Sequence, residues 1–314
     1  MVRCPFRLNA IPPLNAMTDL GANNCHNDGS TDDTLHLEAG VAAAVAAGKR
    51  LYLPAGTGYA LASQFDLISN LYMYGDGVGT VLLPAATYGL RLDGLSNVTL
   101  RDFKLDGNYS TSQFGIIMGA GHVTNITMTG LTIQDFLDSG IYGNCEASGI
   151  QISGCTLTNI RDFGIHFQHE HDPIFGLLGA NGLVISDTTV IGIPGSAGQG
   201  PPHAIYVKVG SNVTLSDCEC GNIDTNALWD NDSAIEIDDV NTGTLTNCDV
   251  YGAVYGIQFS RYGTYGGAVG CQNINVYASG GAPDSCGNYE RYEYLLNDIT
   301  WDGECYGELY VYIP

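Results

Sequence analysis

A short apolar pattern recurs seven times between Tyr88 and Phe259. Each copy has a small residue, then an aliphatic residue, then a variable residue, and in most copies a second bulky apolar residue. The small residues stand at positions 89, 115, 140, 164, 204, 234 and 256, so the spacings are 26, 25, 24, 40, 30 and 22 residues. A repeat of this length predicts a solenoid, in which each period forms one turn of a continuous stack.

A second pattern recurs in step with the first. Its copies begin at Asn97, Asn125, Gly149, Asn212 and Thr242, and within each copy apolar and polar residues alternate. Alternation with a period of two marks a strand with one buried face. An Asp, Gly or Asn ends each alternating stretch, and these residues tolerate the left-handed backbone of a tight turn. Each period therefore holds more than one strand, and the predicted fold class is all-β, a single-stranded parallel β-helix.

The aliphatic residue of the first pattern is expected to point into the solenoid. The predicted buried column consists of Ile116, Ile141, Ile165, Ile205, Ile235 and Ile257. By alternation, the small residue before it and the variable residue after it are both expected to point outward.

One helix is predicted, over residues 33–47. Its apolar residues Leu35, Leu37, Val41, Ala44 and Val45 are expected to share one side and to cap the N-terminal end of the stack, since the first coil must hide its core from water. Glycine accounts for 42 of 314 residues and charged residues for 14%, which suits many short strands and turns. The prediction is a single β-helix domain over residues 1–314, with an N-terminal cap at 1–48, coils at 49–280, and a C-terminal cap or oligomerisation segment at 281–314.

The net charge of the chain excludes some classes of binding partner. A formal net charge of -22 argues against nucleic acid or an anionic membrane, because either would be repelled. No apolar run reaches the roughly 18 residues needed to span a bilayer, and the segment from Met1 to Arg7 lacks the apolar stretch of a signal peptide. The expected location is extracellular or on a virion surface.

The ten cysteines do not form the pattern of a disulfide framework or of a zinc site. Cys155, Cys218 and Cys248 occupy the same position in successive copies of the second pattern, and Cys220 lies two residues further on. Free cysteine behaves as a small buried hydrophobe, so a stacked core column is expected. Cross-links between Cys4 and Cys25, or among Cys271, Cys286 and Cys305, remain open for an oxidising compartment.

Four N-terminal motifs resemble the signature of pectate-lyase-like proteins: residues 18–22 (TDLGA), 27–34 (NDGSTDDT), 51–56 (LYLPAG) and 74–80 (YGDGVGT). That superfamily of right-handed parallel β-helices includes polysaccharide lyases, glycoside hydrolases, alginate epimerases and phage tailspikes. The resemblance covers residues 17–110 by motif and extends to about residue 277 by pattern. It implies a right-handed coil and a polysaccharide as partner.

The resemblance transfers no catalytic residue. Residues 100–108 are similar to a segment of alginate epimerases, yet the epimerase run Tyr-Gly-Phe-Asp-Pro-His has its nearest counterpart at residues 163–170, with His166 in place of the aspartate. The Gly-His-Gly element of polygalacturonases is missing, and residues 230–235 match their Asp-Asp element only loosely.

The outward positions of the first pattern predict a polar wall across successive coils. Its ten members are Tyr142, Asn144, His166, Gln168, Tyr206, Lys208, Glu236, Asp238, Gln258 and Ser260. With stacked strands ~4.8 Å apart, the wall would be about 20 Å long, enough for several sugar units. The small residues are expected to form a floor beside this wall, which together with it would make a groove.

Three insertions, at residues 168–181, 191–202 and 222–232, fall at these coils. Long loops on a rigid scaffold often carry function. The further residues predicted to bind substrate are His203, Trp229, Asp230, Asp232 and Arg261. Trp229 is a candidate platform for a sugar ring. His169, Glu170, His171 and Asp172 could form a metal cluster, but their spacing is not that of a known site, so no metal site is predicted.

Two chemistries fit these residues, and the protein is predicted to be a polysaccharide depolymerase without a cofactor. Hydrolysis would use Glu236 and Asp238 as acid and base, because inverting hydrolases hold two carboxyl groups ~6.5 to 9.5 Å apart. Elimination or epimerisation at a uronate would use Lys208 as base and Tyr206 or His166 as acid. Positive charge for the substrate carboxylate would then come from Lys208 and Arg261, or from bound calcium.

A third hypothesis is a spike protein that binds glycans without cleaving them. The tyrosine-rich stretch at residues 289–312 suits a contact between subunits, which for a tailspike would be a homotrimer.

Overall fold

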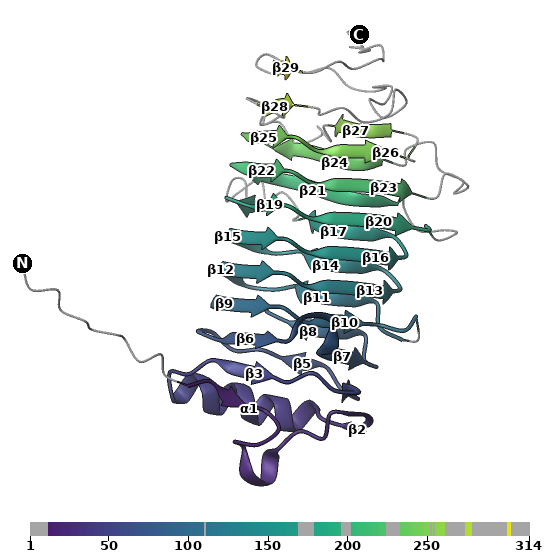
Figure 1. The fold of residues 1–314 in the computed structure, drawn as a ribbon. Helices are drawn as coiled ribbons and strands as arrows, with labels where there is room; N and C mark the ends of the chain where they lie inside the picture. The colour runs from purple at the N-terminus through teal and green to yellow at the C-terminus, as the bar shows by residue number, and fades with distance from the viewer. Residues whose placement is uncertain are drawn as a thin grey trace, which may run out of the picture.

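The computed structural model describes residues 12–109, 111–168, 179–195, 202–223, 233–240, 242–251, 253, 255–260, 274–277 and 300–302. Its strands stack as successive coils of one tall column, with a helix across the N-terminal end (Figure 1). The strands form a sheet of 20 and a sheet of nine, and the paired strands run parallel. The predicted parallel β-helix is confirmed.

Three ladders of strands build the column. The first carries the first sequence pattern and consists of β5 (Phe65–Asp66), β8 (Tyr88–Arg91), β11 (Phe114–Met118), β14 (Ser139–Gly143), β17 (Phe163–Gln168), β21 (His203–Ser211), β24 (Ser233–Val240) and β27 (Tyr255–Ser260).

The second ladder carries the alternating pattern. It consists of β1 (Leu14–Asn15), β3 (Leu51–Leu53), β6 (Tyr72–Gly75), β9 (Ser96–Arg101), β12 (His122–Thr129), β15 (Glu146–Ser153), β18 (Ala180–Asn181), β19 (Val184–Ser186), β22 (Val213–Ser216), β25 (Gly243–Thr246), β28 (Ile274–Tyr277) and β29 (Thr300–Asp302).

The third ladder is the nine-stranded sheet. It consists of β2 (Asp28–Asp32), β4 (Gly58–Leu61), β7 (Val81–Pro84), β10 (Lys104–Asp106), β13 (Thr132–Phe136), β16 (Thr156–Ile160), β20 (Thr189–Ile193), β23 (Glu219–Ile223) and β26 (Asp249–Tyr251). Two short 3-10 turns, η1 (Gly21–Asn23) and η2 (Gly77–Gly79), lie in the first coils.

The turns between the second and third ladders have the backbone that the sequence predicts. Asp102, Asp217 and Asn247 have φ angles of 53°, 54° and 53°, and Gly130 and Gly154 have φ angles of 63° and 59°. The left-handed region is accessible mainly to Gly, Asn and Asp, so these residues set the corner of each coil.

The isoleucine column of the first ladder is buried as predicted. Ile116, Ile141, Ile165, Ile205, Ile235 and Ile257 pair in register on consecutive strands and are fully or almost fully buried. This register fixes which side chains of each strand face away from the core.

The small residues do not form an outward floor, so that prediction is wrong. Ala204 and Ala234 are fully buried members of the core. A Cβ added at Gly140 would lie 2.8 Å from a methyl carbon of Leu157 on the third ladder. The chain bends into each first-ladder strand, and two consecutive residues then face the interior, which breaks the strict alternation. The residue before the small one therefore shares the outer face with the residue after the isoleucine.

Helix α1 (Thr34–Ala46) confirms the predicted cap, with Asp33 at its N-cap position. Leu37, Val41 and Ala44 are buried beneath it. Leu35 is 71% exposed, which corrects its placement on the apolar side. Two residues along a helix turn by about 200°, so Leu35 and Leu37 face opposite ways.

The cysteine column is also confirmed. Cys155, Cys218 and Cys248 each directly precede a third-ladder strand, β16, β23 and β26, and Cys220 lies within β23; all four are buried and carry free thiols. Thr188 takes the same position on the intervening coil. Cys25 is a buried free thiol, whereas Cys4, Cys271, Cys286 and Cys305 lie outside the described residues. The division of the chain into an N-terminal cap, coils and a C-terminal segment, with boundaries at residues 48 and 280, stays a prediction.

Candidate active site

Consecutive coils of the first ladder bring four predicted residues into one row. Tyr142 pairs with His166, His166 with Tyr206, and Tyr206 with Glu236. Gln258 follows Glu236 in the same row by its backbone position on β27. Because Tyr142, His166, Tyr206 and Glu236 each directly follow a buried isoleucine, their side chains leave the strand on the side away from the core.

A second row lies two residues further along each strand. Gln168, Lys208 and Asp238 pair in register, and Ser260 continues the row. Gln168 donates a hydrogen bond from Nε2 to the hydroxyl of Tyr142 at 2.7 Å, which links the two rows. Asn144 follows β14, and its backbone N–H donates to the carbonyl of Met118. Burial raises the pKa of the Tyr142 hydroxyl.

His166 lies buried within aromatic rings. Its ring centroid is 4.2 Å from that of Phe163, 4.9 Å from that of Tyr206 and 5.2 Å from that of Tyr142. Neither of its ring nitrogens has a hydrogen-bond partner among the described residues. Burial, and to a smaller degree the nearby His203, lowers the pKa of His166 to about 3. The imidazole is therefore neutral at neutral pH.

His203 and Glu236 form a buried pair. Nε2 of His203 lies 3.1 Å from Oε2 of Glu236, and Nδ1 of His203 lies 2.8 Å from the hydroxyl and 3.3 Å from the carbonyl oxygen of Ser233. Both side chains of the pair are less than a tenth exposed. Burial lowers the pKa of His203 to about 3 although the carboxylate favours a charged ring, so we assign a neutral imidazole that is hydrogen-bonded to Glu236.

Two proton arrangements satisfy this pair. In one, the Ser233 hydroxyl donates to Nδ1, and Nε2–H donates to an ionised Glu236. In the other, Nδ1–H donates to Ser233 and a protonated Glu236 donates to Nε2. The second arrangement holds one proton more than the first, and the imidazole is neutral in both, so the group formed by Glu236, His203 and Ser233 can release or take up one proton, as acid–base catalysis requires.

The aromatic rings around His166 continue toward the N-terminus as a stripe made of Tyr142, Phe114 and Tyr88. The centroid of Tyr88 is 5.6 Å from that of Phe114, and the centroid of Phe114 is 4.9 Å from that of Tyr142. Tyr88, Phe114 and Tyr142 are partly exposed. Aromatic faces offer large, rigid apolar contacts, so this stripe suits the apolar face of a sugar ring next to the acid–base groups.

The predicted site residues divide into three groups. Tyr142, His166, Tyr206 and Glu236 lie together in one row, with Gln168 and Lys208 beside them. Asp238 and Gln258 are placed by their backbone alone. Trp229, Asp230, Asp232 and Arg261 lie outside the described residues, as does the cluster at residues 169–172.

Sequence reasoning missed Phe163, Ser233, Tyr88 and Phe114, and it treated His203 as a substrate contact and not as the partner of Glu236. All five stand immediately before the small residue of a first-pattern copy. Aromatic and polar side chains recur at that position, and this recurrence is the signal that could have identified them.

Comparison with known families identifies the class of fold. A family model described as a right handed beta helix region matches residues 88–276, so the chain belongs to the right-handed parallel β-helix proteins, as the N-terminal motifs imply. No curated protein sequence matches the chain significantly. Among the described residues no helix is long and apolar enough to cross a membrane.

Solved structures share this fold at low sequence identity. The catalytic unit of an α-1,3-glucanase from Streptomyces thermodiastaticus strain HF3-3 is 15% identical with a TM-score of 0.56, and the match covers 88% of this chain and 55% of that one. An alginate lyase from Paenibacillus sp. strain FPU-7 is 14% identical with a TM-score of 0.50, covering 85% and 95%. The adhesin PfbA of Streptococcus pneumoniae is 12% identical with a TM-score of 0.52, covering 88% and 77%. At these identities the likeness shows the fold alone.

Proposed function

We propose that this protein binds a polysaccharide along the first ladder and cleaves it with Glu236 and His203 as the acid–base centre. The observation that carries the proposal is the 3.1 Å contact between Nε2 of His203 and Oε2 of Glu236, buried at the end of an aromatic stripe. A carboxyl group and an imidazole that share one proton can protonate a leaving oxygen and recover the proton afterwards. That structural neighbours include a glucanase and an alginate lyase supports a polysaccharide as the substrate class.

Hydrolysis is the reaction we favour. Glu236 would protonate the glycosidic oxygen, with His203 hydrogen-bonded to it and holding it in position, and Asp238 would activate water. Residues i and i+2 of a strand lie roughly 6.5 to 7 Å apart along the backbone. A backbone separation of this size allows the two carboxyl groups to lie the ~6.5 to 9.5 Å apart that inverting hydrolases require. The net charge of -22 favours a neutral polymer over a polyanion.

Elimination at a uronate is the second candidate, and His166 is the observation that favours it. A neutral imidazole whose nitrogens make no hydrogen bond of good geometry to the described residues can accept the C5 proton. Tyr206 stacks on His166 with a centroid distance of 4.9 Å and would protonate the leaving oxygen, while Lys208 would face the substrate carboxylate. The sequence-based version of this mechanism assigned the base to Lys208. His166 is the alternative base because its imidazole is unprotonated at neutral pH, although a pKa of about 3 makes it a weak base.

A panel of neutral and uronate-containing polysaccharides tests the proposal. Hydrolysis releases reducing ends without new ultraviolet absorbance, whereas elimination also produces an unsaturated uronate that absorbs. Binding without either product on any member of the panel would contradict cleavage and support the glycan-binding spike. An extracellular or virion-surface location and a homotrimer remain parts of the proposal, and light scattering tests the trimer against the 33.3 kDa of one chain.

A further inference from the structure

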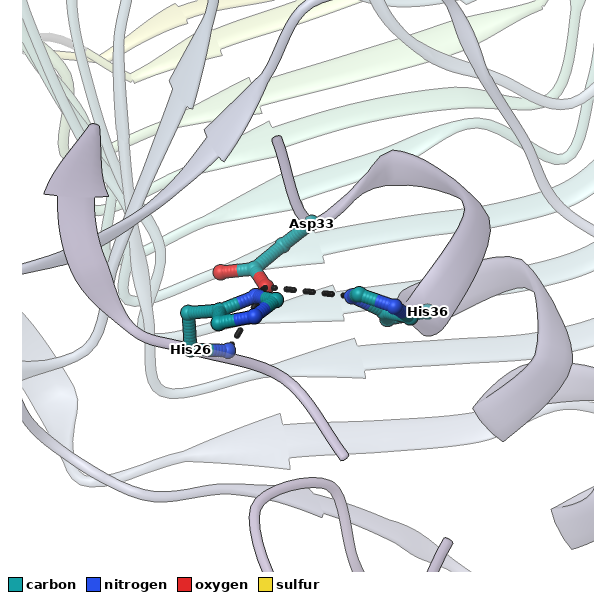
Figure 2. Close-up of side chains that lie close together, drawn as sticks. All are labelled: His26, Asp33 and His36. Carbon is teal, nitrogen blue, oxygen red and sulfur yellow. Dashed lines mark hydrogen bonds and ion pairs between the residues drawn. The ribbon is translucent and has the colours of Figure 1, made fainter. Parts of the chain in front are cut away.

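The N-terminal cap gathers two imidazoles and one carboxylate (Figure 2), several coils away from the candidate active site on β17, β21 and β24 (Figure 1). His26 precedes β2, Asp33 is the N-cap residue of α1, and His36 lies in the first turn of that helix. Nδ1 of His26 lies 3.0 Å from Oδ1 of Asp33, and Nδ1 of His36 lies 3.6 Å from the same oxygen. Segments on both sides of β2 thus converge on one carboxylate oxygen.

The backbone holds Asp33 in place. The side chain is fully buried, Oδ1 accepts the backbone N–H of His26 at 2.7 Å, and Oδ2 accepts the backbone N–H of Asn27 at 3.0 Å. Metal-binding carboxylates are typically oriented by such secondary hydrogen bonds. The carboxylate is therefore fixed independently of the two imidazole rings.

His36 supplies a second, independent observation. Its Nδ1 atom is buried and has no hydrogen-bond partner among the described residues, because 3.6 Å from Asp33 is beyond hydrogen-bond range. A buried nitrogen without a partner costs free energy and calls for an explanation. The rings of His26 and His36 are tilted by 46° with centroids 5.0 Å apart. Each ring has its Nδ1 atom near Oδ1 of Asp33 (Figure 2).

We propose that His26, Asp33 and His36 bind a divalent transition-metal ion of the zinc type. Their candidate ligand atoms all lie within 4.8 Å of one another. Two ligands at about 2.0 to 2.1 Å from a tetrahedral zinc ion are about 3.3 Å apart, and the two separations from Asp33 Oδ1, 3.0 and 3.6 Å, lie close to this value. The nitrogens of the two imidazoles lie within 4.8 Å of each other and would move together on binding the ion. Two imidazoles and one carboxylate suit zinc, whereas calcium and magnesium prefer oxygen ligands alone.

The ion would fasten the segment before β2 to the start of α1. This is the part of the chain that closes the N-terminal end of the core, and solenoids depend on such caps. The side chain of His26 is 45% exposed, so the ion can enter from solvent, and the described residues offer no fourth protein ligand. Water would complete the tetrahedron.

Zinc titration of the full chain tests this site. The protein is treated with a chelator, dialysed under reducing conditions and titrated with zinc chloride by calorimetry, with cobalt absorbance as a second readout. We expect one site of micromolar or tighter affinity, and a melting temperature that rises by several degrees with zinc. His26→Ala and His36→Ala should each weaken binding at least about 10-fold and remove the thermal shift.

His122→Ala is the matched control, since His122 is a half-exposed histidine near a carboxylate, 4.0 Å from Glu146, and should leave binding unchanged. Wild-type affinity in both cap variants would overturn the proposal, as would loss of binding through His169→Ala or His171→Ala instead. Absence of any zinc binding by the wild type would mean that the cluster serves only as a hydrogen-bonded cap.

Discussion

Val190 occupies the space directly against Gly164: a Cβ added to this glycine would lie 2.1 Å from Cγ1 of Val190. The same Cβ would lie 2.6 Å from the carbonyl oxygen of Ala204 on the next coil. Neither approach is compatible with van der Waals contact, so the bend before β17 requires a residue without a side chain.

Gly164→Ala should therefore destabilise the fold by about 1–3 kcal/mol or more, because the core must move to admit a methyl group. Urea unfolding followed by circular dichroism measures the effect. Gly119→Ala is the matched control, since its added Cβ would meet its nearest neighbours at 3.4 Å, an ordinary contact. Equal stability of the two variants would show that the bend can relax.

The sequence was sufficient to predict the stack, since isoleucine at a repeated position fixes the interior wherever a strand has one buried face. It was not sufficient to predict the bend at Gly164, because strict alternation assumes an extended chain. The same assumption hid the role of His203, whose side chain reaches Glu236 across one coil although the two residues are 33 positions apart. Such contacts depend on which residues of neighbouring strands pair with each other. The insertions before β21 and β24 change the spacing of the repeat, so this pairing cannot be read from the sequence.

Ile205→Asp should prevent folding. The side chain is fully buried in the isoleucine column, and an unpaired carboxylate there costs several kcal/mol. Leu35→Asp, which also replaces an aliphatic residue with a carboxylate, should change stability by no more than about 0.5 kcal/mol because Leu35 is 71% exposed. Soluble expression and thermal melting distinguish the two variants. A folded Ile205→Asp protein would contradict the register of the first ladder.

Stability should fall as the pH is lowered from about 6.5 toward 3. Burial lowers the pKa of His166 and of His203 to about 3 from the ordinary 6.5, so between these values the unfolded chain binds more protons than the folded one. Each ring contributes a slope of up to about 1.4 kcal/mol per pH unit. His166→Phe keeps an aromatic ring and should remove one such contribution, whereas Phe136→Leu, in the core on the third ladder, should leave the slope unchanged. Urea unfolding midpoints measured at several pH values give the slope of stability against pH. If His166→Phe has the same slope as wild type, His166 is not a buried neutral ring.

The buried thiols should resist alkylation in the folded protein. Burial raises the pKa of Cys25 and of Cys145 to about 12 and that of Cys155 to about 11. Because the thiolate is the reactive form, labelling at pH 8 should be at least about 100-fold slower than for a free cysteine. Mass spectrometry of labelled peptides, with the urea-unfolded protein as control, measures each rate separately. Rapid labelling of Cys155 in the native protein would contradict the core column.

Glu236→Gln should lower turnover of a cleaved polysaccharide at least about 100-fold while leaving the melting temperature within a few degrees of wild type. The amide keeps the shape and a hydrogen bond to His203, but it cannot exchange the proton that acid–base catalysis requires. Glu146→Gln is the matched control, because Glu146 is about half exposed on the second ladder, away from the row, and should retain full activity.

The two reactions respond differently to further variants. Hydrolysis predicts that Asp238→Asn also loses activity at least about 100-fold and that His166→Phe retains much of it. Elimination predicts the reverse, with His166→Phe inactive and Asp238→Asn active. If Glu236→Gln, Asp238→Asn and His166→Phe all turn over substrate as wild type does, the row on the first ladder is not the active site, and catalysis must be sought on another face of the column.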